Sequence, residues 1–255
     1  SVSAPADSPY ATAVGGVTLA LKRDNSIKWQ TGWGNNRNLL YEYDPFYGSD
    51  VVFDPPNGGF LFGSGGGPSA VYSKPHFQHK LPGTQRLVPD ISWLADPYTG
   101  GVIAISEPFV YPTEFTTYGG TSLACPMFSA LWAIANQEAG APLGQAARHL
   151  YSMPAGTITD VLPINPSIVH SSTNVTGTIT DLFGTTFYSA DQLAAPLENN
   201  TNFLSALWDI PLDNATVLLT FGTDTGLMTT PGWDDVTGLG TPNGKAFADY
   251  FNPAK

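Results

Sequence analysis

The stretch that decides the fold reads Gly119-Gly120-Thr121-Ser122-Leu123-Ala124-Cys125-Pro126, and an apolar segment follows it directly. The glycine pair allows another backbone to approach closely. The apolar run over 123–139 predicts a helix that is apolar almost all round and therefore central. Pro126 fits its start because the first helical turn needs no backbone donor. Ser122 is thus expected at a helix N-terminus, where free N–H groups and a partial positive potential occur.

Two interpretations of Ser122 follow from this position. A serine so placed can act as the nucleophile of an acyl transfer, or its hydroxyl can cap a core helix. Cys125, the single cysteine, cannot form an internal disulfide. We expect it to be a small buried hydrophobe in the first turns of the helix.

The remaining pattern predicts alternating strands and helices. Residues 10–22 are typical of a strand pair with Gly15-Gly16 between the strands, and residues 101–111 of a buried strand or hairpin that leads to the serine motif. Residues 23–68 are rich in Asn, Gly and Pro and indicate loops. Such an alternation is typical of an α/β fold with a parallel sheet. Shorter helices are expected over 143–151 and 244–252.

Composition narrows the class of protein. The 255 residues are enough for one sizeable core, and charged residues make up 12% of them, about half the usual share of about 25%. The net charge of −11 argues against nucleic acid as a partner. No stretch is long and apolar enough to predict a membrane span.

Three N-glycosylation sequons begin at Asn174, Asn199 and Asn214, within a polar stretch rich in Thr and Asn. Their clustering favours a glycoprotein that is secreted or located in a vacuole or lysosome. No signal peptide precedes them, so we expect a mature or trimmed chain.

Five sequence blocks are spread over nearly the whole chain. They are Ser8–Gly16, then Ser64–Tyr72 with Pro75 and Gln78, then Val88–Ser92 with Ala95–Pro97 and Thr99-Gly100, then Gly120–Ser122 with Pro126, and finally Gly232–Asp234 with Thr237–Gly240, Pro242 and Asn243. Together and in this order they resemble the sedolisin family of serine-carboxyl peptidases. The resemblance implies a subtilisin-like α/β fold, with a mainly parallel sheet and helices on both faces.

The resemblance also implies an activity. Ser122 matches the family's nucleophile, which forms an acyl-enzyme when a peptide bond is hydrolysed. A glutamate, oriented by an aspartate, serves the family as base, and a second aspartate stabilises the oxyanion. Carboxyl groups suit acidic conditions, because they exchange protons at about pH 4, where histidine is protonated and cannot act as a base. We therefore expect an acid-acting enzyme, either an endopeptidase or a tripeptidyl-peptidase.

The chain departs from the family at these three carboxyl groups, because no position in it matches any of them. Residues 1–255 correspond to the C-terminal portion of the peptidase domain, with an expected insertion at about 165–220. Asp90 lies in a matching block but is interpreted as structural. Four other acidic residues could replace the missing carboxyl groups, but none lies in a recognisable motif: Asp7, Asp50, Asp54 and Glu114.

Two explanations of the missing groups stay open. A separate N-terminal chain supplies them, which an open strand edge and an uncovered apolar face would favour. Alternatively, the protein is an inactive relative that serves as a binding or structural glycoprotein. A histidine-dependent subtilase would need a base that none of the four histidines supplies by context, namely His76, His79, His149 and His170.

The resemblance further implies a calcium site. Asp160 matches the first ligand and Asp234 the last, and three backbone carbonyls complete the set, from Val161, Thr230 and Gly232. Oxygen-only ligation with two carboxylates suits Ca²⁺. The two aspartates are unusually far apart in the sequence for the family, so Asp181 is an alternative first ligand. A helix N-cap and a turn aspartate that hold no metal are the other interpretation of this pair.

Overall fold

The computed structural model describes residues 2–44, 46, 48–107, 111–163, 177–181, 184–188, 204–210, 215–222 and 227–255. The chain divides into two compact units. The first unit comprises Ser1–Trp33, Gly63–Pro163 and Gly226–Lys255, and the second comprises Gly34–Phe62 and Ile164–Thr225. Across the described ranges, no helix has the length and apolar character needed to cross a membrane.

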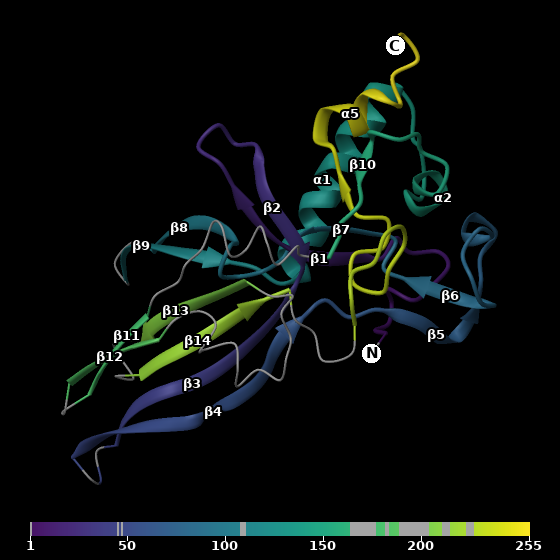
Figure 1. The fold of residues 1–255 in the computed structure, drawn as a ribbon. Coiled ribbons are helices and arrows are strands. Elements are labelled where there is room, and N and C mark those ends of the chain that lie inside the picture. Colours follow the sequence, from purple (N-terminus) through teal and green to yellow (C-terminus); the bar gives the residue numbers. More distant parts are fainter. Residues whose placement is uncertain are drawn as a thin grey trace. The chain divides into compact units, whose positions relative to one another are not determined.

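A three-stranded sheet forms the centre of the first unit (Figure 1). Its strands, in spatial order, are β2 (Ile27–Gly32), β1 (Val14–Leu21) and β7 (Ile91–Leu94). β1 runs parallel to β7 and antiparallel to β2. The described strand pairs of this unit are otherwise antiparallel, so a mainly parallel layout is not confirmed.

The expected strand pair over residues 10–22 is wrong, because β1 runs straight through Gly15 and Gly16. A Cβ atom on Gly15 would lie 2.6 Å from both the Ser92 hydroxyl and the Val236 carbonyl oxygen. The glycines therefore mark close packing inside a strand rather than a turn between strands.

Short antiparallel pairs complete the strands of the first unit. The prediction of a hairpin that leads to the serine motif is confirmed by β8 and β9, but its expected burial is wrong, because Val102 is 69% exposed and Phe115 76%. The strands are β5 (Gly67–Ser73) with β6 (Gln85–Val88), β8 (Gly101–Glu107) with β9 (Tyr111–Tyr118), and β10 (Ile158–Thr159) with β15 (Thr241–Pro242).

Among the residues that the structure describes, three helices and one 3₁₀ turn accompany these strands, and the predicted helices are present although two are shorter than expected. They are α1 (Thr121–Ala139), α2 (Ala147–Leu150), α5 (Gly244–Asp249) and the turn His76–Gln78. α1 packs against β1, β7 and α5. Their common core contains Ile91, Phe128, Leu131, Leu150 and Phe247.

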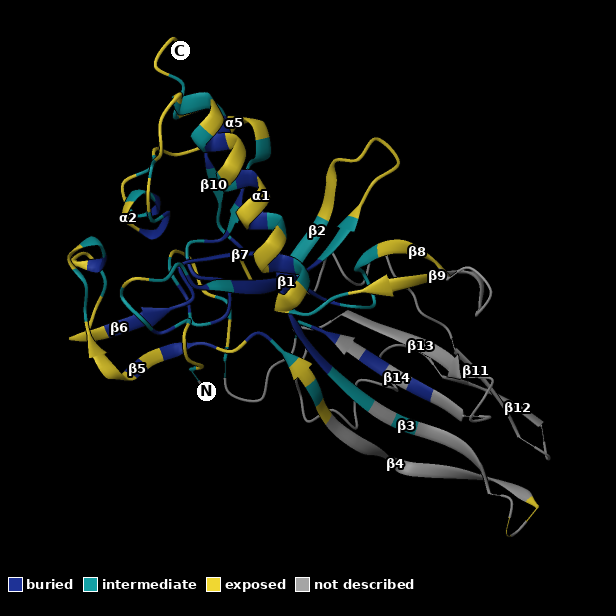
Figure 2. Cartoon of the chain, turned by 180° about the vertical axis from the view of Figure 1, so that it is seen from behind, coloured by how far each residue is buried: buried dark blue, intermediate teal, exposed yellow. Residues whose placement is uncertain are grey.

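Only one side of α1 is buried, although its sequence is apolar almost all round. Figure 2 shows buried and exposed segments alternating along this helix. Ala124, Phe128, Leu131 and Ala135 are buried, whereas Ile134 is 49% exposed. Cys125 is also exposed, so its expected burial is wrong.

The second unit contains strands where the sequence indicated loops. Its four-stranded sheet has the order β13-β14-β3-β4, and a separate hairpin joins β11 to β12. β3 pairs with β14, about 180 residues further along the chain, so this strand depends on distant hydrogen bonds that a local composition does not reveal. The strands are β3 (Gly34–Asp44), β4 (Ser49–Gly63), β11 (Gly177–Asp181), β12 (Gly184–Tyr188), β13 (Leu204–Ile210) and β14 (Ala215–Phe221).

The expected insertion at about 165–220 lies within the second unit. The three sequon asparagines, Asn174, Asn199 and Asn214, lie outside the described residues. Glycosylation therefore stays a prediction from the sequence.

Candidate nucleophile and metal-binding loops

The five sequence blocks meet in the first unit through backbone and side-chain hydrogen bonds. The Asp90 carboxylate accepts from the Ala13 N–H group at 2.8 Å. The Ser64 hydroxyl accepts from the Gly16 N–H group at 3.0 Å and donates to the Val236 carbonyl oxygen at 2.8 Å. The first, second, third and last blocks are thereby joined.

The serine block is held by its glycines. The Gly120 N–H group donates to the Ala95 carbonyl oxygen at 2.5 Å, and Gly120 has a φ of 79°, which favours glycine. A Cβ atom on Gly119 would lie 2.4 Å from the Pro97 nitrogen. The backbone therefore passes too close to the loop after β7 for any side chain at position 119, and this contact sets the start of α1.

Ser122 is the second residue of α1 and is exposed. The N-cap of the helix is Gly120 and no side chain caps it, so the interpretation of Ser122 as the capping residue is wrong. Among the hydrogen bonds of the described residues, none involves the Ser122 hydroxyl. The geometry leaves an accessible hydroxyl in the first turn of a helix, close to free N–H groups.

The described histidines have other contacts. His79 Nδ1 lies 3.0 Å from the His76 carbonyl oxygen, and His149 Nε2 lies 3.0 Å from the Leu143 carbonyl oxygen. None of these three is hydrogen-bonded to Ser122. His170 lies outside the described residues.

Asp90 lies in a buried polar network, as its structural interpretation predicted. Its carboxylate forms an ion pair with Arg86 at 2.5 Å, and both side chains are fully buried. The Tyr151 hydroxyl donates to the same carboxylate at 2.8 Å, and the Gln78 amide donates to the Tyr151 oxygen at 2.7 Å. Burial, followed by the negative charge of Asp90, raises the pKa of the Tyr151 hydroxyl, so it stays a donor.

The carboxylates of Asp160 and Asp234, two of the five proposed metal ligands, lie against one turn. Asp160 Oδ2 accepts from the Gly232 N–H group at 2.7 Å, and Asp234 Oδ2 accepts from the Thr230 N–H group at 3.2 Å. Asp234 Oδ1 accepts from the N–H groups two and three residues further on. The segment 230–232 therefore lies against both carboxylates.

Unpaired oxygens favour a cation at this turn. Asp160 Oδ1 is buried without a hydrogen-bond partner among the described residues. The carbonyl oxygens of Val161, Thr230 and Gly232 likewise accept none of the hydrogen bonds described. Burial raises the pKa of Asp234, and the surrounding N–H groups oppose this shift. Carboxylate and carbonyl oxygens together fit the ligand preference of Ca²⁺.

Two further observations bear on the metal prediction. In the part of the chain that the structure describes, no group of three or more His, Cys, Asp or Glu side chains could hold a metal ion, so the candidate depends on backbone carbonyls. Asp181, the alternative first ligand, lies in β11 of the second unit, and its side chain is outside the described residues.

Comparisons with known proteins point to one group of peptidases. The chain is 32% identical to kumamolisin of Bacillus sp. (strain MN-32) over 178 residues, which are 66% of this chain and 27% of kumamolisin. It is 36% identical to sedolisin of Pseudomonas sp. (strain 101) over 172 residues, which are 67% of this chain and 24% of that relative. Xanthomonalisin of Xanthomonas sp. (strain T-22) is 30% identical over 68% of this chain and 18% of its own length. No family model matches.

A solved structure supports the same relationship at the level of the fold. It is a Pseudomonas sedolisin, described as a serine-carboxyl proteinase, complexed with two molecules of pseudo-iodotyrostatin. The TM-score is 0.56 at 25% identity, and the match covers 96% of this chain and 47% of that chain. The region matched to the curated relatives spans about a quarter of their length or less.

Proposed function

The chain belongs to the sedolisin family of serine-carboxyl peptidases over about two thirds of its length, and from this premise we propose that it is the serine-bearing portion of an acid-acting peptidase. The observation that carries the proposal is the exposed Ser122 in the first turn of α1, held there by Gly119 and Gly120. Its substrates are peptides or proteins. Endopeptidase and tripeptidyl-peptidase action both agree with this site.

The reaction proceeds through an acyl-enzyme. The Ser122 oxygen forms a bond to the scissile carbonyl carbon while its proton passes to a base. The C–N bond then breaks, and the amine leaves with a proton returned by that base. Water hydrolyses the resulting ester and regenerates the serine. Free N–H groups at the helix start favour the negative charge that develops on the carbonyl oxygen.

A separate N-terminal chain of the same precursor supplies the base and the oxyanion donor in this proposal. An uncovered apolar surface supports it. A groove of about 560 Å³ lies between α1 and α5, lined by Met127, Ala130 and Ile134 from α1 and by Ala248 from α5. A covering chain would remove this surface from water.

Two further properties belong to the proposal. Ca²⁺ would be held by Asp160, Asp234 and the carbonyls of Val161, Thr230 and Gly232. Its positive charge would hold together the loop with Asp160 and the loop with Asp234. Secretion, or delivery to a vacuole or lysosome, is supported by the three sequons. Acidic compartments of this kind suit a carboxyl base.

The test combines active-site labelling with intact mass measurement. The complete native material is treated with a fluorophosphonate probe at about pH 4, where a carboxyl base works. Its intact mass is then measured under denaturing conditions. We expect one adduct on Ser122 and a second polypeptide beside the chain. Ser122→Ala should prevent labelling. Ser129→Ala is the matched control on the same helix, because its hydroxyl is already bonded to the Cys125 carbonyl oxygen at 2.9 Å.

A second candidate function is an inactive sedolisin-like glycoprotein that binds or supports other molecules. It is favoured by the Ser122 hydroxyl, which has no base among the described residues. A lone chain with Ser122 unlabelled would exclude the peptidase and leave this candidate.

A further inference from the structure

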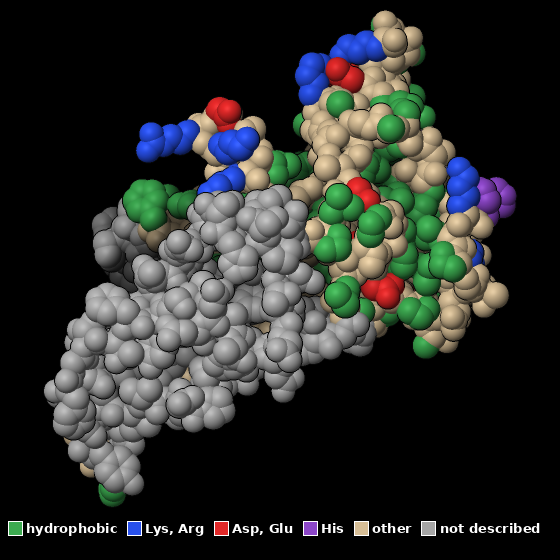
Figure 3. All heavy atoms as spheres, viewed as in Figure 1, with side chains coloured by type: hydrophobic (Ala, Val, Ile, Leu, Met, Phe, Trp, Pro, Cys, Tyr) green, Lys and Arg blue, Asp and Glu red, His purple; other side chains and the backbone are tan. Residues whose placement is uncertain are grey.

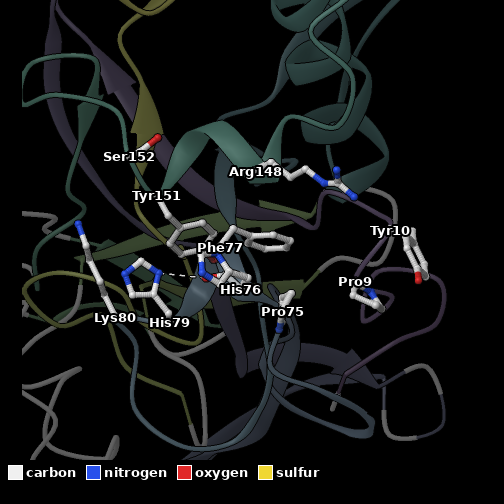
Figure 4. Close-up of a pocket in the computed structure, with 10 residues that line it drawn as sticks. All are labelled: Pro9, Tyr10, Pro75, His76, Phe77, His79, Lys80, Arg148, Tyr151 and Ser152. Atoms are coloured by element: carbon white, nitrogen blue, oxygen red, sulfur yellow. Dashed lines mark hydrogen bonds between the residues drawn. The ribbon is translucent and has the colours of Figure 1, made fainter.

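A cleft of about 600 Å³ lies in the first unit, where three segments meet. Residues before β1, residues around the 3₁₀ turn and residues at the end of α2 line it, and none of them belongs to the serine or metal loops. Figure 4 shows the lining residues: Pro9, Tyr10, Pro75, His76, Phe77, His79, Lys80, Arg148, Tyr151 and Ser152.

The charge of this cleft is opposite to that of the chain. Its lining contains Lys80, Arg148, His76 and His79 but no Asp or Glu, although the chain carries a net charge of −11. Figure 3 shows His side chains in purple beside Lys or Arg side chains in blue, over the part of the molecule that carries α2 and β6. Low-dielectric walls lined by one sign of charge attract ions of the other sign.

The cationic donors are available to a ligand. Lys80 makes no hydrogen bond or ion pair with the described residues. Arg148 donates from Nε to the Gln145 side-chain oxygen at 3.2 Å, which leaves its terminal N–H groups free. Figure 4 shows Lys80 and His79 at one end of the cleft and Arg148 with Tyr10 at the other. The donors therefore lie at two separate positions.

The floor between the two ends is aromatic and rigid. The rings of Phe77 and Tyr151 have centroids 5.7 Å apart. Tyr151 is anchored by its hydrogen bonds to Asp90 and Gln78. Beside this floor, Tyr10 is 82% exposed. A floor that is already ordered lowers the entropy lost when a ligand binds.

We propose that this cleft binds a short acidic peptide segment, with one carboxylate near Lys80, a second near Arg148, and an apolar or aromatic side chain over Phe77 and Tyr151. Two separated cationic ends favour a ligand whose charges are spaced along a chain. The aromatic floor favours a side chain between them. Overall repulsion by a net charge of −11 opposes a nucleic acid. This site is independent of peptide hydrolysis at Ser122.

The experiment measures binding of a fluorescein-labelled peptide, acetyl-Glu-Gly-Phe-Gly-Glu-amide, by fluorescence anisotropy. The protein is the complete precursor carrying Ser122→Ala, so that cleavage cannot contribute. We expect saturable binding that weakens with added salt. Lys80→Ala and Arg148→Ala should each weaken it roughly tenfold, the expected loss of a charge-assisted contact. Lys28→Ala, at an exposed lysine of β2, is the matched control and should leave binding unchanged.

Three outcomes would overturn the proposal. The peptide with Gln in place of both Glu residues binds as well as the acidic one, which would remove the role of charge. Lys28→Ala weakens binding as much as the cleft variants do, which would indicate attraction without a site. Inorganic phosphate at equal concentration displaces the peptide, which would indicate a simple anion site.

Discussion

At the scale of single residues, the buried pair Arg86–Asp90 constrains the packing of the first unit. Both side chains are fully buried, and the carboxylate also accepts from Ala13 and Tyr151. Asp90 thus joins the residue before β1, the strand β6 and the C-cap residue of α2. It therefore supports the sheet and the floor of the basic cleft together.

Asp90→Asn is predicted to destabilise the first unit by about 3–5 kcal/mol, because the Arg86 guanidinium would stay buried without its counter-charge. Urea denaturation followed by tryptophan fluorescence measures the change in midpoint. Lys245→Ala is the control: its ion pair with Asp249 has a lysine that is 79% exposed, so the midpoint should stay unchanged. Equal midpoints for the two variants would contradict the structural role of Asp90.

A side chain's role is predictable from the sequence where it depends on neighbours in the chain. The Ser122 hydroxyl was placed at a helix start by the glycines before it, and α1 begins one residue earlier. Cys125 was misjudged, because an apolar sequence does not tell which side of a helix is covered. The exposed side of α1 is visible only in the packed structure.

At the scale of elements, the loop between β9 and α1 shows how a short segment is determined by its surroundings. A Cβ atom on Gly119 would lie 2.5 Å from the Ala95 carbonyl oxygen. The loop after β7 thus sets where α1 begins and where its first-turn hydroxyl lies.

Gly119→Ala is predicted to displace this loop, because the atoms that it meets belong to the backbone and cannot rotate away. Labelling of Ser122 by the fluorophosphonate probe should slow roughly tenfold or more. Gly140→Ala tests whether the effect is specific. Gly140 ends α1 with a φ of 65° and has open space around its Cβ position, so alanine there costs about 1–2 kcal/mol of stability but should leave the labelling rate unchanged. Similar labelling of both variants would refute the role of this loop.

Elements with a strong local period were predictable, and those that depend on distant partners were not. α1 was expected from its apolar run, and the hairpin β8–β9 from its position before the serine motif. β3 was missed because Asn, Gly and Pro around it indicate loops, while its hydrogen bonds come from β14. β1 was divided at Gly15-Gly16 because close packing cannot be distinguished from a turn by composition.

At the scale of the whole molecule, the two loops with the proposed calcium ligands join segments about 70 residues apart in sequence. The unpaired Oδ1 of Asp160 is buried there. A cation that binds only the folded state would stabilise the protein by mass action.

Removal of calcium with EDTA is predicted to lower Tm by several degrees. At a free calcium concentration of about 100 times Kd the stabilisation is about 2.7 kcal/mol, and each kcal/mol shifts Tm by about 2–4 °C for a chain of this size. Differential scanning fluorimetry with and without added Ca²⁺ measures the shift. Asp160→Asn should abolish it, whereas Asp249→Asn, at the exposed pair, should keep it. A Tm that does not respond to calcium would rule the site out.

The amino-acid sequence by itself determined the serine block, the ligand candidates and the helices, because these depend on residue type and on spacing along the chain. The tertiary structure decided what spacing cannot express. In the folded chain, β1 continues through its glycines and one side of α1 is exposed. The Asp160 and Asp234 carboxylates lie against the segment 230–232, and Lys80 and Arg148 line one cleft. The physical reason is that close packing and hydrogen bonds between distant segments depend on distances that exist only after the chain has folded.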